Sequence, residues 1–317
     1  MAKADDFAPL AVTSRSGFDE SVHFGAVVAF ARGGDVAFSV GNPHALIYPR
    51  SASKPVQALA MVRAGLDLAP ELLALVCASH DGTPEHITGV ERILASAGLD
   101  PSALGNTAAL PFNEAAAHDV LRHGGAPSAL LMNCSGKHAG MLATCVHNHW
   151  SRGPDYLDVD HPLQLAITAA FAEVAGSPAA IGVDGCGAPA HVVELVQLAA
   201  AFRAIATGAA GNAGQAVYTA MTSHPRLVGG AHRDVTLAMA GLPGLLAKDG
   251  AEGVFAAALP DGTTVAMKIA DGGDRARAAV LLAALGHLGV DVAALAPQME
   301  VKIMGHGQPV GVVRALV

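Results

Sequence analysis

A serine and a lysine three residues apart stand in the stretch YPRSASKPVQ, as Ser51 and Lys54. Three residues is close to one helical turn, so both side chains would lie on one face of a helix. A buried, neutral lysine there could take the serine proton and make the hydroxyl a nucleophile. The alternative is a helix-capping serine followed by a surface lysine. The chain has only six lysines, and this one precedes Pro55, Val56 and Leu59, so the sequence favours a desolvated lysine.

A second hydroxyl occurs in CASHDG, where Ser79 and His80 follow an apolar run. Such a segment can present a side chain at the rim of a pocket, although an ordinary helix end is the alternative reading. Enzymes with a Ser-x-x-Lys pair also carry Ser-Asp-Asn and Lys-Thr-Gly triplets, and neither string occurs here. By itself this block favours the helix end, but Ser79 could act as the second hydroxyl. Lys268, in MKIADGG on a predicted strand, lies as the lysine of the missing triplet would.

Two cysteines and a lysine have the chemistry of a metal site. Cys134, Lys137 and His138 lie together in NCSGKHAGML, and Cys186 lies in VDGCGAP. Two thiolates, a nitrogen ligand and an open position would suit zinc. The spacing matches no zinc-finger pattern, and a lysine must lose its proton before it binds a metal, so buried inert thiols are the alternative. A disulfide framework is not expected from four widely spaced cysteines.

The elements that must position these residues follow from hydrophobic periodicity and turn residues. A helix is predicted from Lys54 to Ala64, with Pro55 tolerated in its first turn. Further helices are predicted at about 70–77, 84–97, 137–149, 162–175, 190–205, 211–222 and 273–287. Hairpins are predicted over 22–40, from 253–258 to 263–270, and in the tail VKIMGHGQPVGVVRAL. Hairpins at both ends of the chain and a helical middle predict one antiparallel sheet covered by helices.

Composition limits the classes of function. The 317 residues are 52% hydrophobic and 15% charged, which predicts a single domain over 1–317, or one with a helical subdomain within about 70–225. The net charge is -8 and no basic block occurs, which argues against nucleic acid or a membrane surface as a partner. The start, MAKADDFAPLAV, lacks the pattern of a secretory signal, so we expect a cytoplasmic protein.

Six blocks in order, ESVHFG, RSASKPVQ, CASHDG, NCSGKHAGML, VDGCGAP and MKIADGG, resemble the asparaginase II family, the rhizobial-type or class 3 L-asparaginases. The resemblance runs from about residue 15 to the C-terminus. It implies an α/β (α+β) fold similar to serine β-lactamases and glutaminases. It also implies a homodimer that hydrolyses L-asparagine to L-aspartate and ammonia.

The resemblance also implies roles for individual residues. Ser51 with Lys54 and Ser79 with Lys268 would be two Ser-Lys tandems. Zn²⁺ would be held by Cys134, Lys137 and Cys186 and would aid substrate binding. Arg50, Asp184 and His138 fall in the same blocks and are expected to shape the site or contact the substrate.

We take Ser51 as the nucleophile, because a helix N-terminus favours a developing negative charge, and Ser79 as its competitor. Two other functions stay open. One is a different Ser-Lys amidase, such as a glutaminase or a penicillin-recognising enzyme. The other is a non-catalytic protein that binds zinc or a metabolite.

Overall fold

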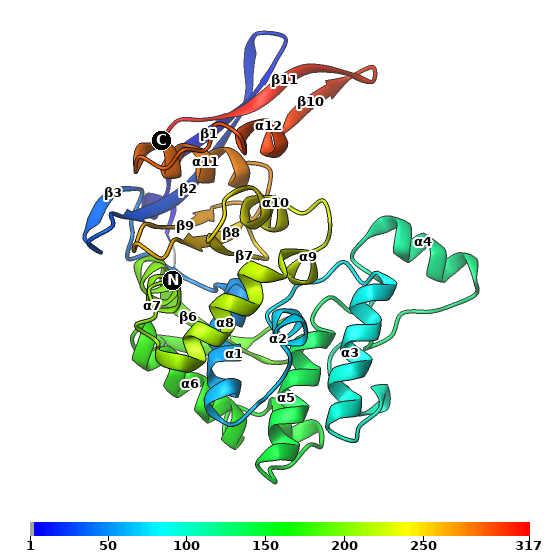
Figure 1. The fold of residues 1–317 in the computed structure, drawn as a ribbon. Helices are drawn as coiled ribbons and strands as arrows, with labels where there is room; N and C mark the ends of the chain where they lie inside the picture. The colour runs from blue at the N-terminus through cyan, green and yellow to red at the C-terminus, as the bar shows by residue number, and fades with distance from the viewer. Residues whose placement is uncertain (1–2) are drawn as a thin grey trace.

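The computed structural model describes residues 3–317, and its centre is an eight-stranded antiparallel sheet made from both ends of the chain (Figure 1). The strands run in the order β10-β11-β1-β2-β9-β8-β7, and β3 also pairs with β2. Their bounds are β1 (Ala8–Arg15), β2 (Phe18–Phe30), β3 (Val36–Val40), β7 (Leu246–Gly250), β8 (Val254–Ala258), β9 (Thr264–Ile269), β10 (Lys302–Gly305) and β11 (Gln308–Ala315). The predicted fold class, an antiparallel sheet from both chain ends with a helical lobe, is confirmed.

Helices occupy most of the middle of the chain and lie below and beside the sheet in Figure 1, while two more, close to the C-terminus, lie by its upper strands. They are α1 (Lys54–Arg63), α2 (Pro70–Val76), α3 (Pro84–Ser96), α4 (Glu114–Arg122), α5 (Ser135–His147), α6 (Pro162–Val174), α7 (Leu195–Ala206), α8 (Gly211–Ser223), α9 (Pro225–Val228), α10 (Asp234–Gly241), α11 (Arg277–His287) and α12 (Ala296–Met299). The 3₁₀ helices are η1 (Ala4–Asp6), η2 (Arg50–Ser53), η3 (Pro101–Ala103) and η4 (Pro154–Leu157). A small second sheet has the order β4 (Leu46–Ile47), β6 (Pro189–Glu194), β5 (Ala180–Val183).

The three predicted hairpins are confirmed as β2–β3, β8–β9 and β10–β11. The helix predicted over 190–205 is wrong in its first five residues, which belong to strand β6 and pair with both β4 and β5. Helix α7 begins only after Glu194, whose backbone N–H donates to the Gln197 side chain at 2.8 Å. This capping contact marks the true N-terminus of the helix. Strands β1 and β7 were not among the predicted elements.

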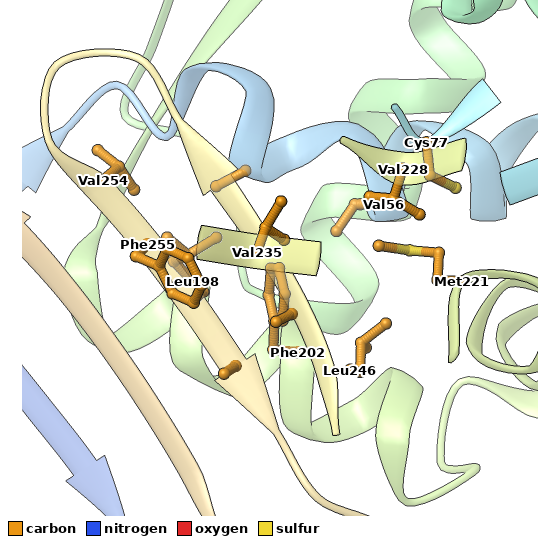
Figure 2. Close-up of a cluster of buried hydrophobic side chains, with 14 of the residues drawn as sticks. Val56, Cys77, Leu198, Phe202, Met221, Val228, Val235, Leu246, Val254 and Phe255 are labelled. Atoms are coloured by element: carbon orange, nitrogen blue, oxygen red, sulfur yellow. The ribbon is translucent and has the colours of Figure 1, made fainter. Parts of the chain in front are cut away.

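The core lies between β7–β8 and the helices that pack on them. Figure 2 shows Leu246 of β7 and Phe255 of β8 in one apolar cluster with Phe202 of α7 and Val56 of α1. Every residue of β7 and β8 is buried, which is the pattern of strands covered on both faces. The cluster therefore fixes β7, the last strand of the sheet, relative to the start of α1.

No helix within residues 3–317 is long and apolar enough to cross a membrane.

Candidate active site

Ser51 lies in a tight turn that leads into α1. The 3₁₀ helix η2 precedes α1 directly, and Arg50 has a φ of 53°, a left-handed conformation that is uncommon outside glycine. Strand β7 packs tightly against this turn. A Cβ atom added to Gly250 would lie only 2.3 Å from the carbonyl oxygen of Pro49. Only glycine allows so close an approach. The turn therefore holds Ser51, which is half-buried, beside the end of β7.

Lys54 is buried as the sequence predicted, with 1% of its surface exposed. Its Nζ lies 3.1 Å from Ser79 Oγ, 3.1 Å from Cys134 Sγ and 2.5 Å from the carbonyl oxygen of Ala78. Among the described residues it makes no hydrogen bond to Ser51, the serine with which the sequence paired it. The lysine of the Ser-x-x-Lys motif thus contacts the second hydroxyl.

Ser79 is held by backbone hydrogen bonds on a segment that follows α2. Its N–H donates to the carbonyl oxygen of Val228 at 3.0 Å, and the N–H of His80 donates to that of Asn133 at 3.1 Å. His80 is fully buried, its Nε2 lies 2.9 Å from Ser135 Oγ, and burial lowers its pKa well below 6.5. His80 is therefore a neutral structural residue and does not contact the Ser79 hydroxyl.

The second lysine at Ser79 is Lys248, not Lys268. Lys248 Nζ, on β7, lies 3.1 Å from Ser79 Oγ and contacts Asp249 through both its carboxylate and its carbonyl oxygen. Lys268 Nζ instead donates to the carbonyl oxygens of Glu252 and Ile269. The predicted Ser79–Lys268 pairing is wrong because Lys268 lies on β9, inside the sheet, whereas β7 is the strand next to the serines.

The sequence held a signal for Lys248 that was missed. Residues 248–250 read Lys-Asp-Gly, which differs in one position from the Lys-Thr-Gly triplet that accompanies Ser-x-x-Lys motifs. Ser79-His80-Asp81 keeps only the serine of Ser-Asp-Asn and differs from it at two positions. A search that tolerated one substitution would therefore have found the Lys248 segment but not the Ser79 segment.

Burial changes the acid-base behaviour of Lys248. The side chain is fully buried, and desolvation lowers its pKa to about 8 despite the opposing effect of the Asp249 carboxylate. The pKa of Asp249 is in turn held well below its usual range: burial opposes this, but the neighbouring Lys248 and Arg233 outweigh it. A lysine with a pKa near 8 is neutral often enough at neutral pH to act as a base.

Both serines line one cavity of about 310 Å³, a volume suited to a small molecule. Its other lining residues are Phe112, Asn133, Arg233, Asp249, Gly250, Ala251, Glu252, Gly253, Gly272, Gly273, Asp274 and Arg277. The cavity thus combines two hydroxyls with arginine and carboxylate side chains.

The predicted metal ligands also come together. Lys137 Nζ lies 3.0 Å from Cys186 Sγ, and Cys134 lies close enough to both residues for their side chains to shift its pKa. The neighbouring Cys186 side chain is the main cause of a Cys134 pKa well below its usual value; burial opposes this shift, and Lys54 and Lys137 add to it. Burial opposes charge on Lys137, but the two sulfurs raise its pKa overall. The three residues therefore form a thiolate–ammonium cluster. The cluster adjoins Lys54, whose Nζ contacts the Cys134 sulfur.

The remaining predicted site residues lie around this cluster and do not line the cavity of the serines. Arg50 and Asp184 form an ion pair of 2.7 Å with each other. His138 is fully buried, and its Nδ1 lies 2.7 Å from the Tyr156 hydroxyl. Its Nε2 is buried without a hydrogen-bond partner among the described residues. These positions suit residues that shape the thiol cluster.

The geometry places a hydroxyl between two buried lysines, beside a small polar cavity, which is the arrangement for transferring an acyl group to a serine. A sequence profile of the L-asparaginase II family matches residues 11–315. The chain belongs to the L-asparaginase II family. It is accordingly an asparaginase-type amidohydrolase, a hydrolase that acts on amides.

Solved structures of similar fold include a β-lactamase from Mycobacterium bovis, with 15% sequence identity and a TM-score of 0.42. That match covers 83% of this chain and 94% of the other. The native form of Mglu matches at 16% identity and a TM-score of 0.37, over 83% of this chain and 63% of Mglu. A search of curated protein sequences found no match.

Proposed function

We propose that the protein hydrolyses L-asparagine to L-aspartate and ammonia through an acyl-enzyme formed on serine. One observation carries the proposal: Ser79 Oγ lies 3.1 Å from the Nζ atoms of both Lys54 and Lys248. A nucleophilic system needs a hydroxyl within hydrogen-bond reach of a base, and the buried Lys248 is such a base. Membership of the L-asparaginase II family supports the substrate.

In the proposed mechanism Ser79 passes protons and Ser51 attacks. A hydroxyl has one proton and two lone pairs, so Ser79 can give its proton to neutral Lys248 while Lys54 donates to its oxygen. Ser79 then takes the proton of Ser51, whose oxygen attacks the side-chain amide carbon. Ser79 is only 4% exposed, whereas Ser51 is half-buried in the turn that precedes α1. Backbone N–H groups at a helix start can stabilise the oxyanion that forms.

The remaining steps return the enzyme to its starting state. The C–N bond breaks, the nitrogen takes a proton from the lysine side of the network, and ammonia leaves. Water then attacks the acyl-enzyme, its proton passes to the same network, and the Ser51–acyl bond breaks to release aspartate. Direct attack by Ser79 is the rival arrangement, because both lysines contact that oxygen.

Covalent trapping separates the two arrangements. A diazoketone analogue of asparagine should alkylate the nucleophile, and peptide mass mapping should place the adduct on Ser51. We expect Ser51→Ala and Ser79→Ala each to lose about 10³-fold or more in kcat. Ser53→Ala, which removes a hydroxyl that donates only to the Arg50 carbonyl oxygen, should keep most of the activity. An adduct on Ser79 overturns the assignment of the attacking oxygen.

Substrate comparison tests the function itself. Ammonia release from asparagine should greatly exceed that from glutamine, and the β-lactam nitrocefin should not be turned over. Faster turnover of glutamine or nitrocefin would point to another Ser-Lys amidase. A purified protein that releases no ammonia from asparagine, with or without Zn²⁺, would refute the proposal.

We also propose that Cys134, Lys137 and Cys186 hold Zn²⁺. No group of three or more His, Cys, Asp and Glu side chains gathers for a metal within residues 3–317, so the set depends on the lysine nitrogen. The donor chemistry fits, because the amine of Lys137 contacts the Cys186 sulfur, Cys134 lies beside them, and a metal would replace the protons of these groups. Bound zinc would supply a positive charge beside Lys54 and so aid substrate binding.

Metal analysis tests this site. Wild-type protein should hold zinc, and Cys134→Ser and Cys186→Ser should lose most of it. Cys145→Ser is the matched control, since burial raises the pKa of that thiol to about 12 and it takes no part in the cluster. Equal zinc content in all four proteins would exclude the site.

The quaternary structure and the location are a further part of the proposal. We propose a cytoplasmic homodimer. Light scattering coupled to size-exclusion chromatography should give twice the chain mass of 31.8 kDa.

A further inference from the structure

One wall of the serine cavity carries two arginines with unused hydrogen-bond donors. Arg233 Nη1 and Arg277 Nε are buried, and neither has a hydrogen-bond partner among the described residues. Arg277 is only 6% exposed. Buried donors in proteins are nearly always paired, so it is unusual that two side chains of one cavity lining each keep an unused donor.

Other contacts hold both guanidinium groups in fixed orientations. Arg233 Nη2 lies 2.5 Å from Asp249 Oδ2, and its guanidinium lies over the Phe112 ring, 4.5 Å from the ring centroid. Arg277 Nη2 lies 2.9 Å from Asp234 Oδ2, and Nη1 donates to the carbonyl oxygen of Gly250 at 3.3 Å. A guanidinium that is already fixed loses little entropy when it binds a carboxylate.

The local charges leave room for a carboxylate that binds by directed hydrogen bonds. Arg233 Nη1 also lies 3.5 Å from Asp81 Oδ1, an ion pair without a hydrogen bond, and Asp274 lies 3.5 Å from Arg277. The surrounding acids are Asp81, Asp234, Asp249, Glu252 and Asp274, against the cations Lys54, Arg233, Lys248 and Arg277, so a bound carboxylate would be held by directed hydrogen bonds and not by an excess of positive charge. Burial raises the pKa of Asp234, which shifts the balance towards positive charge.

A carboxylate without an ion-pair partner among the described residues also lines the cavity. Glu252 makes no ion pair within residues 3–317 and has a φ of 61°, a strained conformation for a residue other than glycine. It belongs to the short turn between β7 and β8, next to Gly253. The cavity therefore offers cationic donors and a free carboxylate, which together match the charges of a free α-amino acid.

We propose that Arg233 and Arg277 bind the α-carboxylate of the substrate and that Glu252 binds its α-ammonium group. The identity of the substrate rests on the proposed function, but the site itself does not. Arg50 and Asp184, which were expected to shape the site or contact the substrate, are paired with each other and do not line the cavity. The two arginines would restrict the enzyme to amides of free amino acids and exclude simple amides.

An unpaired arginine nitrogen is not sufficient by itself to mark a site. Arg203 also has a buried Nε without a partner, but it lies on α7 beside Gly33 and Gly34 and does not line the cavity. What distinguishes Arg233 and Arg277 is that both face the space that contains the serines. Arg203 therefore provides a matched control.

Calorimetric binding of product analogues tests the proposal. L-aspartate is compared with 3-aminopropanoate, which lacks the α-carboxylate, and with succinate, which lacks the α-ammonium. Wild type should bind L-aspartate about 10- to 100-fold more tightly than either analogue. Arg277→Gln should lose the preference over 3-aminopropanoate only, Glu252→Gln the preference over succinate only, and Arg203→Gln neither.

Several results would overturn the proposal. Wild type that binds the three ligands equally or not at all would do so, as would Arg277→Gln with the wild-type preference. If Arg277→Gln fails to fold, as judged by its melting temperature, Arg233→Gln provides the same comparison. Ammonia release is measured in parallel. If the protein releases ammonia but shows no ligand preferences, only the proposed arginine and glutamate site is refuted. If it shows the ligand preferences but releases no ammonia, only the asparaginase proposal is refuted.

Discussion

Replacing Asp249 by asparagine should move the pH at which the enzyme becomes active. Asp249 contacts Lys248 through a carboxylate oxygen and so favours the protonated lysine. An opposite charge at this range is worth about 1–3 pKa units, each about 1.36 kcal/mol. Asparagine keeps an oxygen that can accept a hydrogen bond from Lys248 but removes the charge. The pKa of Lys248 should fall from about 8 to about 5–7.

The sign of the effect follows from the role of Lys248 as a base. The lysine must be neutral to accept a proton, so activity rises with pH through its pKa. At pH 6 about 1% of a lysine with a pKa of about 8 is neutral, against about 10% or more when the pKa is 7 or lower. Relative to its own high-pH plateau, Asp249→Asn should therefore be at least about 10-fold more active at pH 6 than wild type.

Other charged groups also act on the pKa of Lys248, and the Asp249→Asn variant must leave them unchanged. Lys54 of α1 and Arg233, just before α10, both favour the neutral lysine, and the Cys77 thiol lies nearby. Asp234→Asn is the control, because it removes a carboxylate of the same network that contacts Arg277 and not Lys248.

The assay is kcat/KM for asparagine from pH 5 to 9. Asp249→Glu, which keeps the charge, should stay closer to the wild-type profile than Asp249→Asn. The reasoning is refuted if Asp249→Asn loses activity evenly at every pH and its acid limb stays in place. That result would assign Asp249 a purely structural role.

Three further outcomes follow from the same structure. Lys248→Met should lower kcat by about 10²- to 10⁴-fold, because it removes the proposed base. Lys268→Met removes only hydrogen bonds to carbonyl oxygens and should change kcat less than about 3-fold. Equal losses of kcat in the two variants would contradict the assignment of Lys248 as the second lysine. Gly250→Ala should lower the free energy of unfolding by about 1–3 kcal/mol and should also lower kcat, because the new Cβ would push the Pro49 carbonyl and displace the turn of Ser51. Urea denaturation and steady-state kinetics measure the two effects. An unchanged kcat would show that the turn tolerates the methyl group. Phe202→Ala, in the cluster of Figure 2, should lower the free energy of unfolding by about 3–5 kcal/mol, because it leaves a cavity in the core. The folded variant should keep the wild-type KM. A raised KM would mean that this core sets the geometry of the site directly.

Local patterns in the sequence were enough for most single elements. Helices α3 and α6 and the hairpin β8–β9 appear within one or two residues of the predicted bounds, because periodicity and turn residues act over short distances. Strand β7 was missed for a physical reason. All five of its residues are buried, two of them charged, so it shows neither alternation nor an apolar run.

The sequence by itself determined which residue types are present for chemistry: the serine and lysine of YPRSASKPVQ, a second serine and the cysteine–lysine set. Only the tertiary structure decided their partners. Spacing places Ser51 and Lys54 on neighbouring turns, but the position of Lys54 Nζ depends on the packing of α1 against the segment after α2, and there it meets Ser79. Lys248 reaches the same oxygen from β7, 169 residues along the chain from Ser79. Such a contact depends on strand pairing across the whole fold, which local sequence patterns do not record.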